Sequence, residues 1–219
     1  MPSATRPLLP LASLMTVALS FGLTYGLSAP LFTLALTDKG YGPQFIAANA
    51  IMHAIGVLGL APFLPRIAAR FGPRMPMLLA LATLACVLVA LPLAPSVWLW
   101  FPLRLALGAA TEVLLILSES WLNQITTDQT RTRTMGLYSA VLSAGFALGP
   151  LILAGVGRHG FTPFGISAAI IVAALVCVAM PWMHAPTLEH AQHSGLWRYV
   201  KLAPIAISVT LLMAMLEAA

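Results

Sequence analysis

The sequence predicts an all-α membrane protein that crosses the bilayer several times, and three observations lead to this fold class. The chain of 219 residues is 60% apolar and only 8% charged, whereas soluble domains have roughly 25% charged residues. Apolar runs of about 20 residues, enough for one helix to cross a bilayer, recur along the chain. Most charged residues lie between these runs, so the net charge of +5 indicates membrane topology. It does not indicate a nucleic-acid-binding face, on which basic residues cluster.

Six apolar runs are long enough to be complete spans. They are expected at about residues 8–36, 44–64, 75–93, 97–123, 134–156 and 161–183. A seventh apolar run at 201–219 follows a polar connector. The predicted domains are therefore a six-helix unit at 1–183, a cytoplasmic connector at 184–200 and the start of a seventh transmembrane helix at 201–219. This helix would open a C-terminal half that is otherwise truncated.

The first span is apolar but is expected to be broken at Gly22, Gly26 and Pro30. Such residues are tolerated in a membrane helix because neighbouring helices re-satisfy the freed backbone groups. Tyr25 lies among them and is a candidate for the wall of a cavity, with plain packing as the alternative.

The second span carries Asn49 and His53, which are four residues apart and so share one helix face. Asn49 is a second candidate for the cavity wall. His53 is either a proton-relay group, because histidine titrates near physiological pH, or a packing residue. Packing is the favoured interpretation.

The fourth span is the most informative part of the chain, because Arg104, Glu112 and Glu119 lie within one apolar run. A charge at the membrane centre costs roughly 2.5–3.5 kcal/mol on insertion scales. At about 100° per residue, the three side chains fall within about 80° of one another. We expect this shared face to look into protein or a water-filled cavity, where charges pair or meet a ligand. Glu119 has the alternative of reaching the membrane surface from the end of the span.

The basic residues predict the orientation of the chain in the membrane. If the spans alternate, most of them fall on one side, and only Lys39 and Arg158 fall on the other. By the positive-inside rule, this places the N-terminus in the cytoplasm. The residues on the predicted cytoplasmic side are Arg6, Arg66, Arg70, Arg74, Arg131, Arg133, Arg198 and Lys201.

The chain also contains an internal repeat of about 88 residues. Arg70–Gly72 before the third span matches Arg158–Gly160 before the sixth, and Pro76 just inside the third matches Pro163. Because three spans are an odd number, two consecutive units must lie in opposite orientations. An inverted repeat of this kind predicts a binding site near the bilayer midplane, where the two units meet.

The fifth span carries the most specific local motif, formed by Gly136, Gly145 and Gly149-Pro150. Glycines allow membrane helices to approach closely, and a helix break at the proline can set where a bundle rocks. Tyr138 in the same span is a third candidate for the cavity wall.

Two further patterns accompany this glycine motif. The loop Pro65–Arg74 contains Arg70, Gly72 and Arg74 in a fixed register, and in the fourth span Arg104 is followed by Gly108.

Together these motifs resemble those of the major facilitator superfamily (MFS), over residues 8 to about 183. Glu119 followed by Ser120 and Trp121 is most similar to its YcaD-like branch. The chain departs from the family pattern at several positions. Ala69 stands where the family usually has aspartate and Pro65 where it has glycine, while Leu153 and Ala154 replace a closing glycine pair.

The resemblance implies a six-helix MFS N-terminal bundle of two inverted three-helix repeats, with a partial seventh helix. It also implies a secondary active transporter of a small molecule across the bacterial inner membrane, with proton-coupled efflux as the expected mode and no cofactor. Arg104 would bind an anion or hold a carboxylate. Glu112, which belongs to no family motif, would accept the proton, with His53 as a weaker candidate. Expected partners are the substrate, protons, lipid and a missing C-terminal six-helix half.

Two alternatives follow from the same residues. The chain alone is either a truncated, inactive half or a half that pairs with another copy, and truncation is favoured. An intramembrane serine protease would need a serine with a histidine base nearby. Ser118, Ser120 and Ser143 lie in spans, but none has a Gly-x-Ser-Gly setting. An enzyme is therefore not expected, and no metal site is predicted. ATP-driven transport is also disfavoured, because the sequence contains no phosphate-loop pattern.

Overall fold

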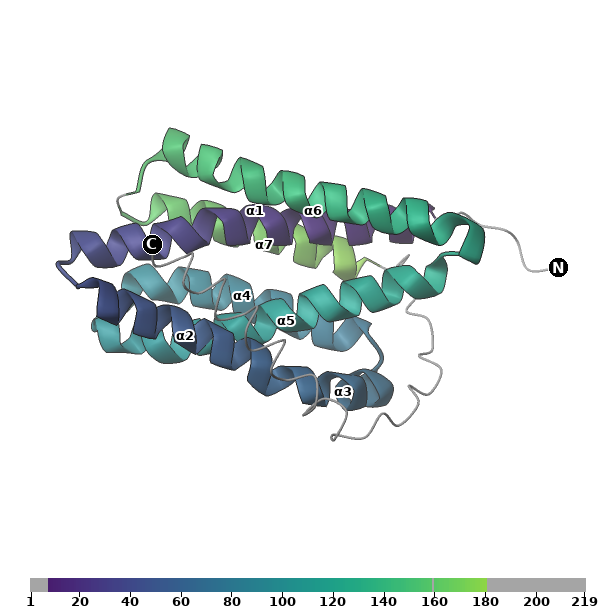
Figure 1. Ribbon diagram of the computed structural model, residues 1–219, viewed down its shortest axis with the longest axis horizontal. Helices are drawn as coiled ribbons and strands as arrows, with labels where there is room; N and C mark the ends of the chain where they lie inside the picture. The colour runs from purple at the N-terminus through teal and green to yellow at the C-terminus, as the bar shows by residue number, and fades with distance from the viewer. Residues whose placement is uncertain (1–7, 159, 181–219) are drawn as a thin grey trace.

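The computed structural model describes residues 8–158 and 160–180, which form a bundle of long helices (Figure 1). Six helical segments are long and apolar enough to cross a membrane. In chain order the elements are α1 (Leu8–Asp38), α2 (Pro43–Leu60), the 3₁₀ turn η1 (Ala61–Phe63), α3 (Leu64–Phe71), α4 (Arg74–Leu93), the 3₁₀ turn η2 (Val97–Leu99), α5 (Trp100–Ile125), α6 (Asp128–Val156) and α7 (Thr162–Ala179). The predicted connector at 184–200 and the seventh span at 201–219 lie outside the described residues.

The all-α prediction is confirmed for the described residues, which contain no strand. The predicted loop at Pro65–Arg74 is wrong in part, because most of it is the helix α3. This short helix buries Leu64 and Ala68 on one side and exposes Arg66 and Arg70 on the other. An amphipathic segment of this kind is compatible with a membrane surface, so charged residues did not mark a loop here.

The fifth span also begins earlier than predicted, at Asp128 instead of about Thr134. Its first turn is stabilised by a capping box, in which the Thr127 backbone N–H donates to Thr130 Oγ1 at 3.2 Å. Exposed Asp128 and Arg131 form an i,i+3 ion pair at 3.2 Å on this turn. The polar residues therefore start the helix before it enters the apolar run.

The first span is not broken. Pro30 lies inside a continuous α1, although it removes one backbone N–H from the helix. Gly22 and Gly26 serve another purpose: a Cβ on Gly22 would collide with the Leu142 carbonyl oxygen, and one on Gly26 with that of Phe146. These glycines let α1 and α6 approach backbone to backbone.

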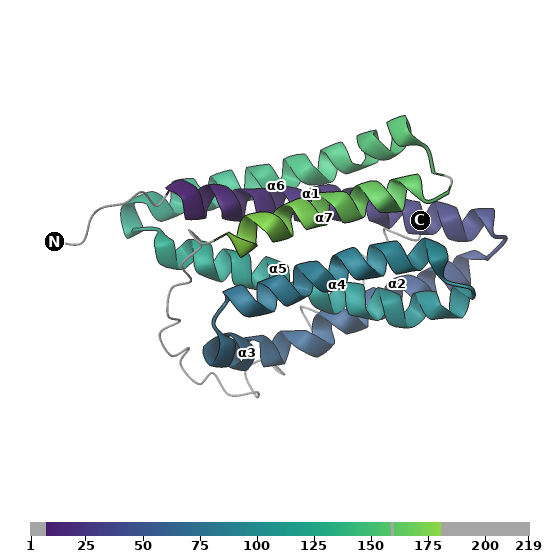
Figure 2. The same ribbon diagram turned by 180° about the vertical axis from the view of Figure 1, so that it is seen from behind.

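The helix contacts repeat across the two three-helix units. The first unit is α1, α2–α3 and α4, and the second is α5, α6 and α7. The α1·α6 contact has its counterpart in α5·α2, and α1·α7 has its counterpart in α5·α4, while α4 packs on α7 and α1 on α5 (Figures 1 and 2). Exchanging the units therefore reproduces the same set of helix pairs, as the predicted repeat requires.

The close glycine contacts fix the register of this repeat. Gly22 lies against the Leu142 carbonyl, and Gly108 lies against the His53 carbonyl. The displacement is 86 residues from Gly22 to Gly108 and 89 residues from His53 to Leu142. Gly56 and Gly145 are also 89 residues apart, and each packs on the backbone of the first helix of the other unit. The offset of about 88 residues expected from sequence is thus reproduced in packing.

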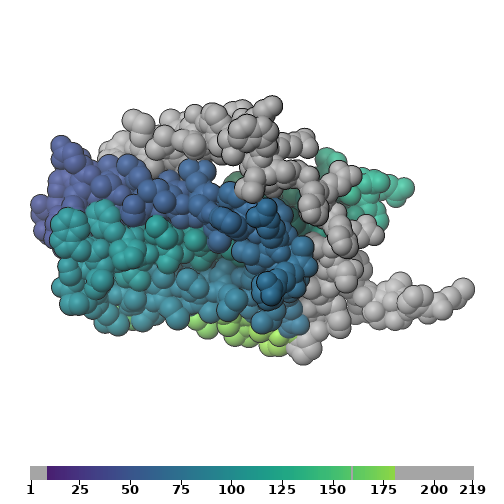
Figure 3. Space-filling model, turned by 90° about the horizontal axis from the view of Figure 1, so that it is seen from below, coloured from purple at the N-terminus to yellow at the C-terminus, as the bar shows by residue number. Residues whose placement is uncertain are grey.

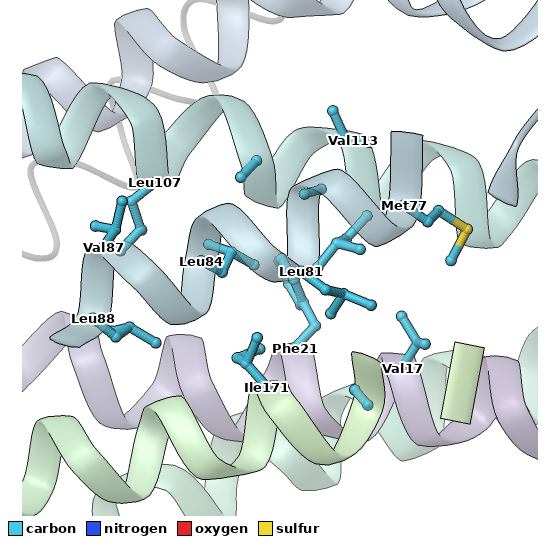
Figure 4. Packing of buried hydrophobic residues seen from close by; sticks show 14 of the residues in the cluster. Val17, Phe21, Met77, Leu81, Leu84, Val87, Leu88, Leu107, Val113 and Ile171 are labelled. Carbon is cyan, nitrogen blue, oxygen red and sulfur yellow. The ribbon is translucent and has the colours of Figure 1, made fainter. Parts of the chain in front are cut away.

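The apolar core fills the space between α1, α4, α5 and α7. Figure 4 shows Val17 and Phe21 from α1 facing Leu81 and Leu84 from α4, with Ile171 from α7 beside them. On the face seen in Figure 3, blue atoms of α2 and α3 lie directly beside teal atoms of α4 and α5. This arrangement holds the charged fourth span between α2 on one side and α1 and α4 on the other.

Candidate substrate and proton site

Arg104 lies inside the bundle, with only 3% of its surface exposed. Its guanidinium carbon Cζ is 4.2 Å from the centroid of the Phe32 ring on α1. Phe32 in turn makes edge contacts with Trp100 and Phe164, at ring-centroid distances of 6.0 and 6.1 Å. A desolvated cation–π contact of this kind is worth about 2 kcal/mol. The predicted membrane-buried arginine therefore has an aromatic partner that the sequence pattern did not identify.

Asn49 and His53 lie on the face of α2 that packs on α5, and both are buried. The backbone of His53 touches Gly108, and Arg104 and Glu112 are one helical turn before and after that glycine on α5. We call Asn49, His53, Arg104 and Glu112 the polar seam. The structure thus places His53 beside Arg104 across the α2·α5 contact, with Asn49 and Glu112 at neighbouring turns of the same two helices.

The seam contains polar atoms whose hydrogen-bonding capacity is not used within the described residues. His53 Nδ1 and Asn49 Nδ2 are buried and have no hydrogen-bond partner among those residues. A buried polar group without a partner costs roughly 1–3 kcal/mol. His53 also interacts electrostatically with Arg104, and its ring lies edge-on to Tyr25 at 5.6 Å between centroids. Groups held at such a cost are suited to meeting water, a proton or a ligand.

Glu112 and Glu119 are half-buried on α5 and interact electrostatically with each other. Glu119 also acts electrostatically on Tyr138 of α6. The Tyr138 hydroxyl is hydrogen-bonded to Ser118 Oγ at 2.7 Å, and both side chains are buried. Tyr138 therefore fixes α6 to α5 beside Glu119. Ser118 was considered from sequence only as a nucleophile, and its bond to Tyr138 had no sequence signal.

Aromatic rings line the first helix next to the seam. Phe21 and Tyr25 stack at 5.9 Å, and Phe146 of α6 meets both rings edge-on at 6.1 and 5.6 Å. The sequence analysis named Tyr25 but missed Phe21 and Phe146. The spacing of Phe21 and Tyr25 by four residues on one helix face was an available signal.

A small pocket lies beside these rings, where α1, α4, α5 and α7 meet. Three pairs among its lining residues are related by the repeat: Phe21 with Leu107, Tyr25 with Thr111, and Leu84 with Ile171. The pocket therefore lies about the axis that relates the two three-helix units. It is completed by Thr24 and Ser28.

The residues of the predicted loop motif lie at the junction of α3 and α4. Gly72 ends α3 with a positive φ of 70°, and exposed Arg70 lies over the Phe71 ring. Arg74 instead reaches across to the end of α7.

The glycine motif of α6 divides between two faces of that helix. Gly145 and Gly149 are buried against the α1 backbone, whereas Gly136 and Pro150 are exposed on the opposite side, with open space around Gly136. Residues 8–158 and 160–180 contain no group of three or more histidine, cysteine or acidic residues placed to hold a metal ion.

Comparison with known proteins decides the family. The model of the Major Facilitator Superfamily matches residues 14–218. The chain belongs to the major facilitator superfamily. Its six described membrane-span helices fit a multi-pass membrane protein, and the family that it matches is one of transporters, not of enzymes. Assignment to the YcaD-like branch stays a prediction.

Two curated relatives from this superfamily are similar to part of the chain. An uncharacterized MFS-type transporter, YfkF of Bacillus subtilis (strain 168), is 26% identical over 149 residues, covering 68% of this chain and 38% of that protein. The multidrug resistance protein MdtG of Enterobacter lignolyticus (strain SCF1) is 29% identical over 168 residues, covering 75% of this chain and 39% of that protein. The matched part of the chain thus spans less than two fifths of the length of either relative.

Proposed function

We propose that this protein takes part in proton-coupled export of a small molecule across the bacterial inner membrane, with its N-terminus in the cytoplasm. The observation that carries the proposal is the polar seam between α2 and α5. A membrane-buried arginine, a buried histidine and a half-buried glutamate lie together there. Ionisable groups in a membrane span mark proton or substrate pathways far more often than anchoring segments.

The charges of the fourth span suggest how the proton is carried. Arg104 is always ionised, so it can balance one of the two carboxylates of Glu112 and Glu119. The second carboxylate then has to bind a proton or meet a cation when water leaves the site, because an unpaired charge is costly in low dielectric. We assign the proton to Glu112, which belongs to the polar seam whereas Glu119 does not, and give His53 the role of an alternative acceptor.

The aromatic rings beside the seam suggest the part of the site that meets the substrate. Tyr25 and Phe146 are half-buried and meet edge-on. The Tyr25 ring also lies against His53 and lines the pocket on the axis of the repeat. Aromatic faces supply large apolar contact, and the Tyr25 hydroxyl adds a polar group. We therefore expect an organic molecule with an apolar body.

The direction of transport rests on a relative. The multidrug resistance protein MdtG is named for resistance, which supports export over uptake. The excess of basic residues on the side of α3 supports a cytoplasmic position for that side.

A second six-helix half is the expected partner. Buried residues of α6 are confined to Tyr138, Gly145, Gly149 and Leu153. Its exposed side carries Gly136, Ser139, Ala140, Ser143, Ala144 and Ala147. Small residues let a further helix approach closely in a membrane, and family transporters place their site between two such units.

The proton role of Glu112 is tested with Glu112→Gln in energised inverted membrane vesicles, with ethidium and a panel of antibacterial compounds as probes. The matched control is Asp128→Asn, which removes a carboxylate from the exposed start of α6. We expect Glu112→Gln to lower proton-driven transport at least tenfold and the control to leave it unchanged. Full proton-driven transport by Glu112→Gln would remove Glu112 from the mechanism. Wild-type vesicles that move no compound of the panel would contradict export.

A further inference from the structure

Thr24 of α1 carries a buried hydroxyl that does not bond to its own helix. Serine and threonine hydroxyls inside helices commonly donate to a carbonyl three or four residues back. Buried Thr111 and Ser167 do so here, at 2.8 and 3.0 Å. Thr24 is only 6% exposed, and its Oγ1 has no hydrogen-bond partner among the described residues. A buried hydroxyl without a partner is costly, so this side chain is suited to binding a molecule that comes from outside the chain.

Thr24 lines the small pocket on the axis that relates the two three-helix units. The space open to the centre of a water molecule in this pocket is about 10 Å³, which is close to what a single water needs. The pocket is therefore far too small for an organic substrate. Its apolar wall takes one side chain from each of α1, α4, α5 and α7 (Figure 4), namely Phe21, Leu84, Leu107 and Ile171.

The hydroxyls that line the pocket have complementary hydrogen-bonding capacities. Thr111 uses its hydrogen on the Gly108 carbonyl at 2.8 Å, and Ser28 uses its hydrogen on the Tyr25 carbonyl at 3.4 Å. Both oxygens therefore keep lone pairs with which to accept, whereas Thr24 still has its hydrogen to donate. A water that accepts from Thr24 and donates to Ser28 and Thr111 makes three hydrogen bonds. This is the number typical of a buried water.

The composition of the pocket wall favours a neutral ligand over an ion. None of the eight lining residues carries a charge at neutral pH. An ion that left its hydration shell to enter this pocket would have no charge to balance it, which is costly in low dielectric. The pocket thus matches water in size, in charge and in the number of donors and acceptors.

We propose that one ordered water binds in the axis pocket, held by Thr24, Ser28 and Thr111, and joins α1 to α5 by hydrogen bonds. These are the first helices of the two units, and they pack on each other. The water therefore supplies a polar link between the units at the axis of the repeat. This site is separate from the polar seam, and it stands or falls independently of the proposed transport function.

Radiolytic hydroxyl-radical labelling tests the site in the intact wild-type protein without any substrate. A short X-ray pulse splits bound water in place, and the radicals oxidise the nearest side chains. Leu84 lines the pocket and is 1% exposed, whereas Leu88 lies one turn further along α4, is 0% exposed and does not line it. Both are labelled in Figure 4.

We expect Leu84 to be oxidised several-fold faster than Leu88 in the wild type, and this difference to be lost in Thr24→Val. Equal oxidation of the two leucines in the wild type would overturn the proposal. A difference that persists in Thr24→Val would also overturn it, because Thr24 would then not hold the water.

The stability of Thr24→Val gives an independent test, because the two cases predict opposite signs. Valine has nearly the shape of threonine, so it removes the hydroxyl and little else. If the hydroxyl bonds to water, the ratio of unfolded to folded protein in detergent should rise about fivefold. If it has no partner, the ratio should stay unchanged or fall, and the proposal would be wrong.

The matched control is Thr83→Val on α4. Thr83 is exposed, and its hydroxyl donates to the Leu79 carbonyl of its own helix at 2.8 Å. We expect this change to alter the ratio by less than about twofold, as is usual for surface substitutions. An equal rise in both variants would show that the effect is not specific to the pocket, which would contradict the proposal. If Thr24→Val does not fold, the comparison of Leu84 with Leu88 in the wild type decides alone.

Discussion

At the scale of single residues, the buried charges of the fourth span are stabilised in different ways. Arg104 has the face of Phe32, while Glu112 and Glu119 keep partial contact with the surroundings. The sequence predicts that Arg104 is shielded from lipid, because its helix face is shared with two carboxylates. It does not predict Phe32, because a ring 72 positions away enters only through the α1·α5 contact.

The contact between Arg104 and Phe32 can be measured by a double-mutant cycle with Arg104→Gln and Phe32→Leu. Because the pair is buried, we expect a coupling energy of about 1–2 kcal/mol. Unfolding in detergent micelles gives the four stabilities. The matched control is the exposed pair Arg70 and Phe71, separated by 5.4 Å, with Arg70→Gln and Phe71→Leu. Water weakens the attraction there, so its coupling should be smaller. Equal coupling in the two cycles would mean that burial does not strengthen the Arg104 contact.

At the scale of helices, two pairs of parallel-running neighbours are brought together by glycine. The α1·α6 pair uses Gly22, Gly26, Gly145 and Gly149, whereas the α2·α5 pair uses Gly56 and Gly108. The repeat register places Glu112 on α5 at the position of Gly26 on α1. The second close contact of α1·α6 is thus absent from α2·α5, where the carboxylate takes its place. Divergence between the two units occurs at the residue to which we assign the proton.

Substitution of Gly149 tests whether the glycines hold α1 against α6. A Cβ at this position would lie 2.5 Å from the backbone carbon of Gly26 and the backbone nitrogen of Leu27. Overpacking of this kind costs about 1–3 kcal/mol, so Gly149→Ala should lower the free energy of unfolding in detergent by that amount. Gly155 lies on the same helix with nothing within 4 Å, and Gly155→Ala should be neutral or stabilise by up to about 1 kcal/mol. Similar destabilisation by both changes would show that the effect is not specific to the α1·α6 contact.

At the scale of the whole molecule, the sequence predicts the number and order of spans and the offset of the repeat, because apolar length and glycine–proline positions are local signals. It misses the helix α3 and misplaces the start of α6, because the charged residues of both segments are compatible with helix outside the apolar core of the membrane. The hydrogen bond from Arg74 to the Ala179 carbonyl could not be predicted, since it depends on the relative position of two helix ends.

The exposed face of α6 supports a last prediction about assembly. Ser143 and Ala147 lie on this face one turn apart, opposite the glycines that contact α1. If a second six-helix unit packs there, a cysteine at Ser143 should be shielded from a membrane-permeant maleimide in the assembled protein. A cysteine at Val172 of α7, which is 46% exposed on the outside of the bundle, should face lipid in any assembly and provides the reference rate. Both variants are made with Cys86 and Cys177 replaced by serine. We expect labelling at Ser143→Cys to be several-fold slower than at Val172→Cys in membranes, and to approach it after the unit is separated in detergent. Equal labelling in membranes would mean that this face of α6 has no protein neighbour, which would contradict a site formed between two six-helix units.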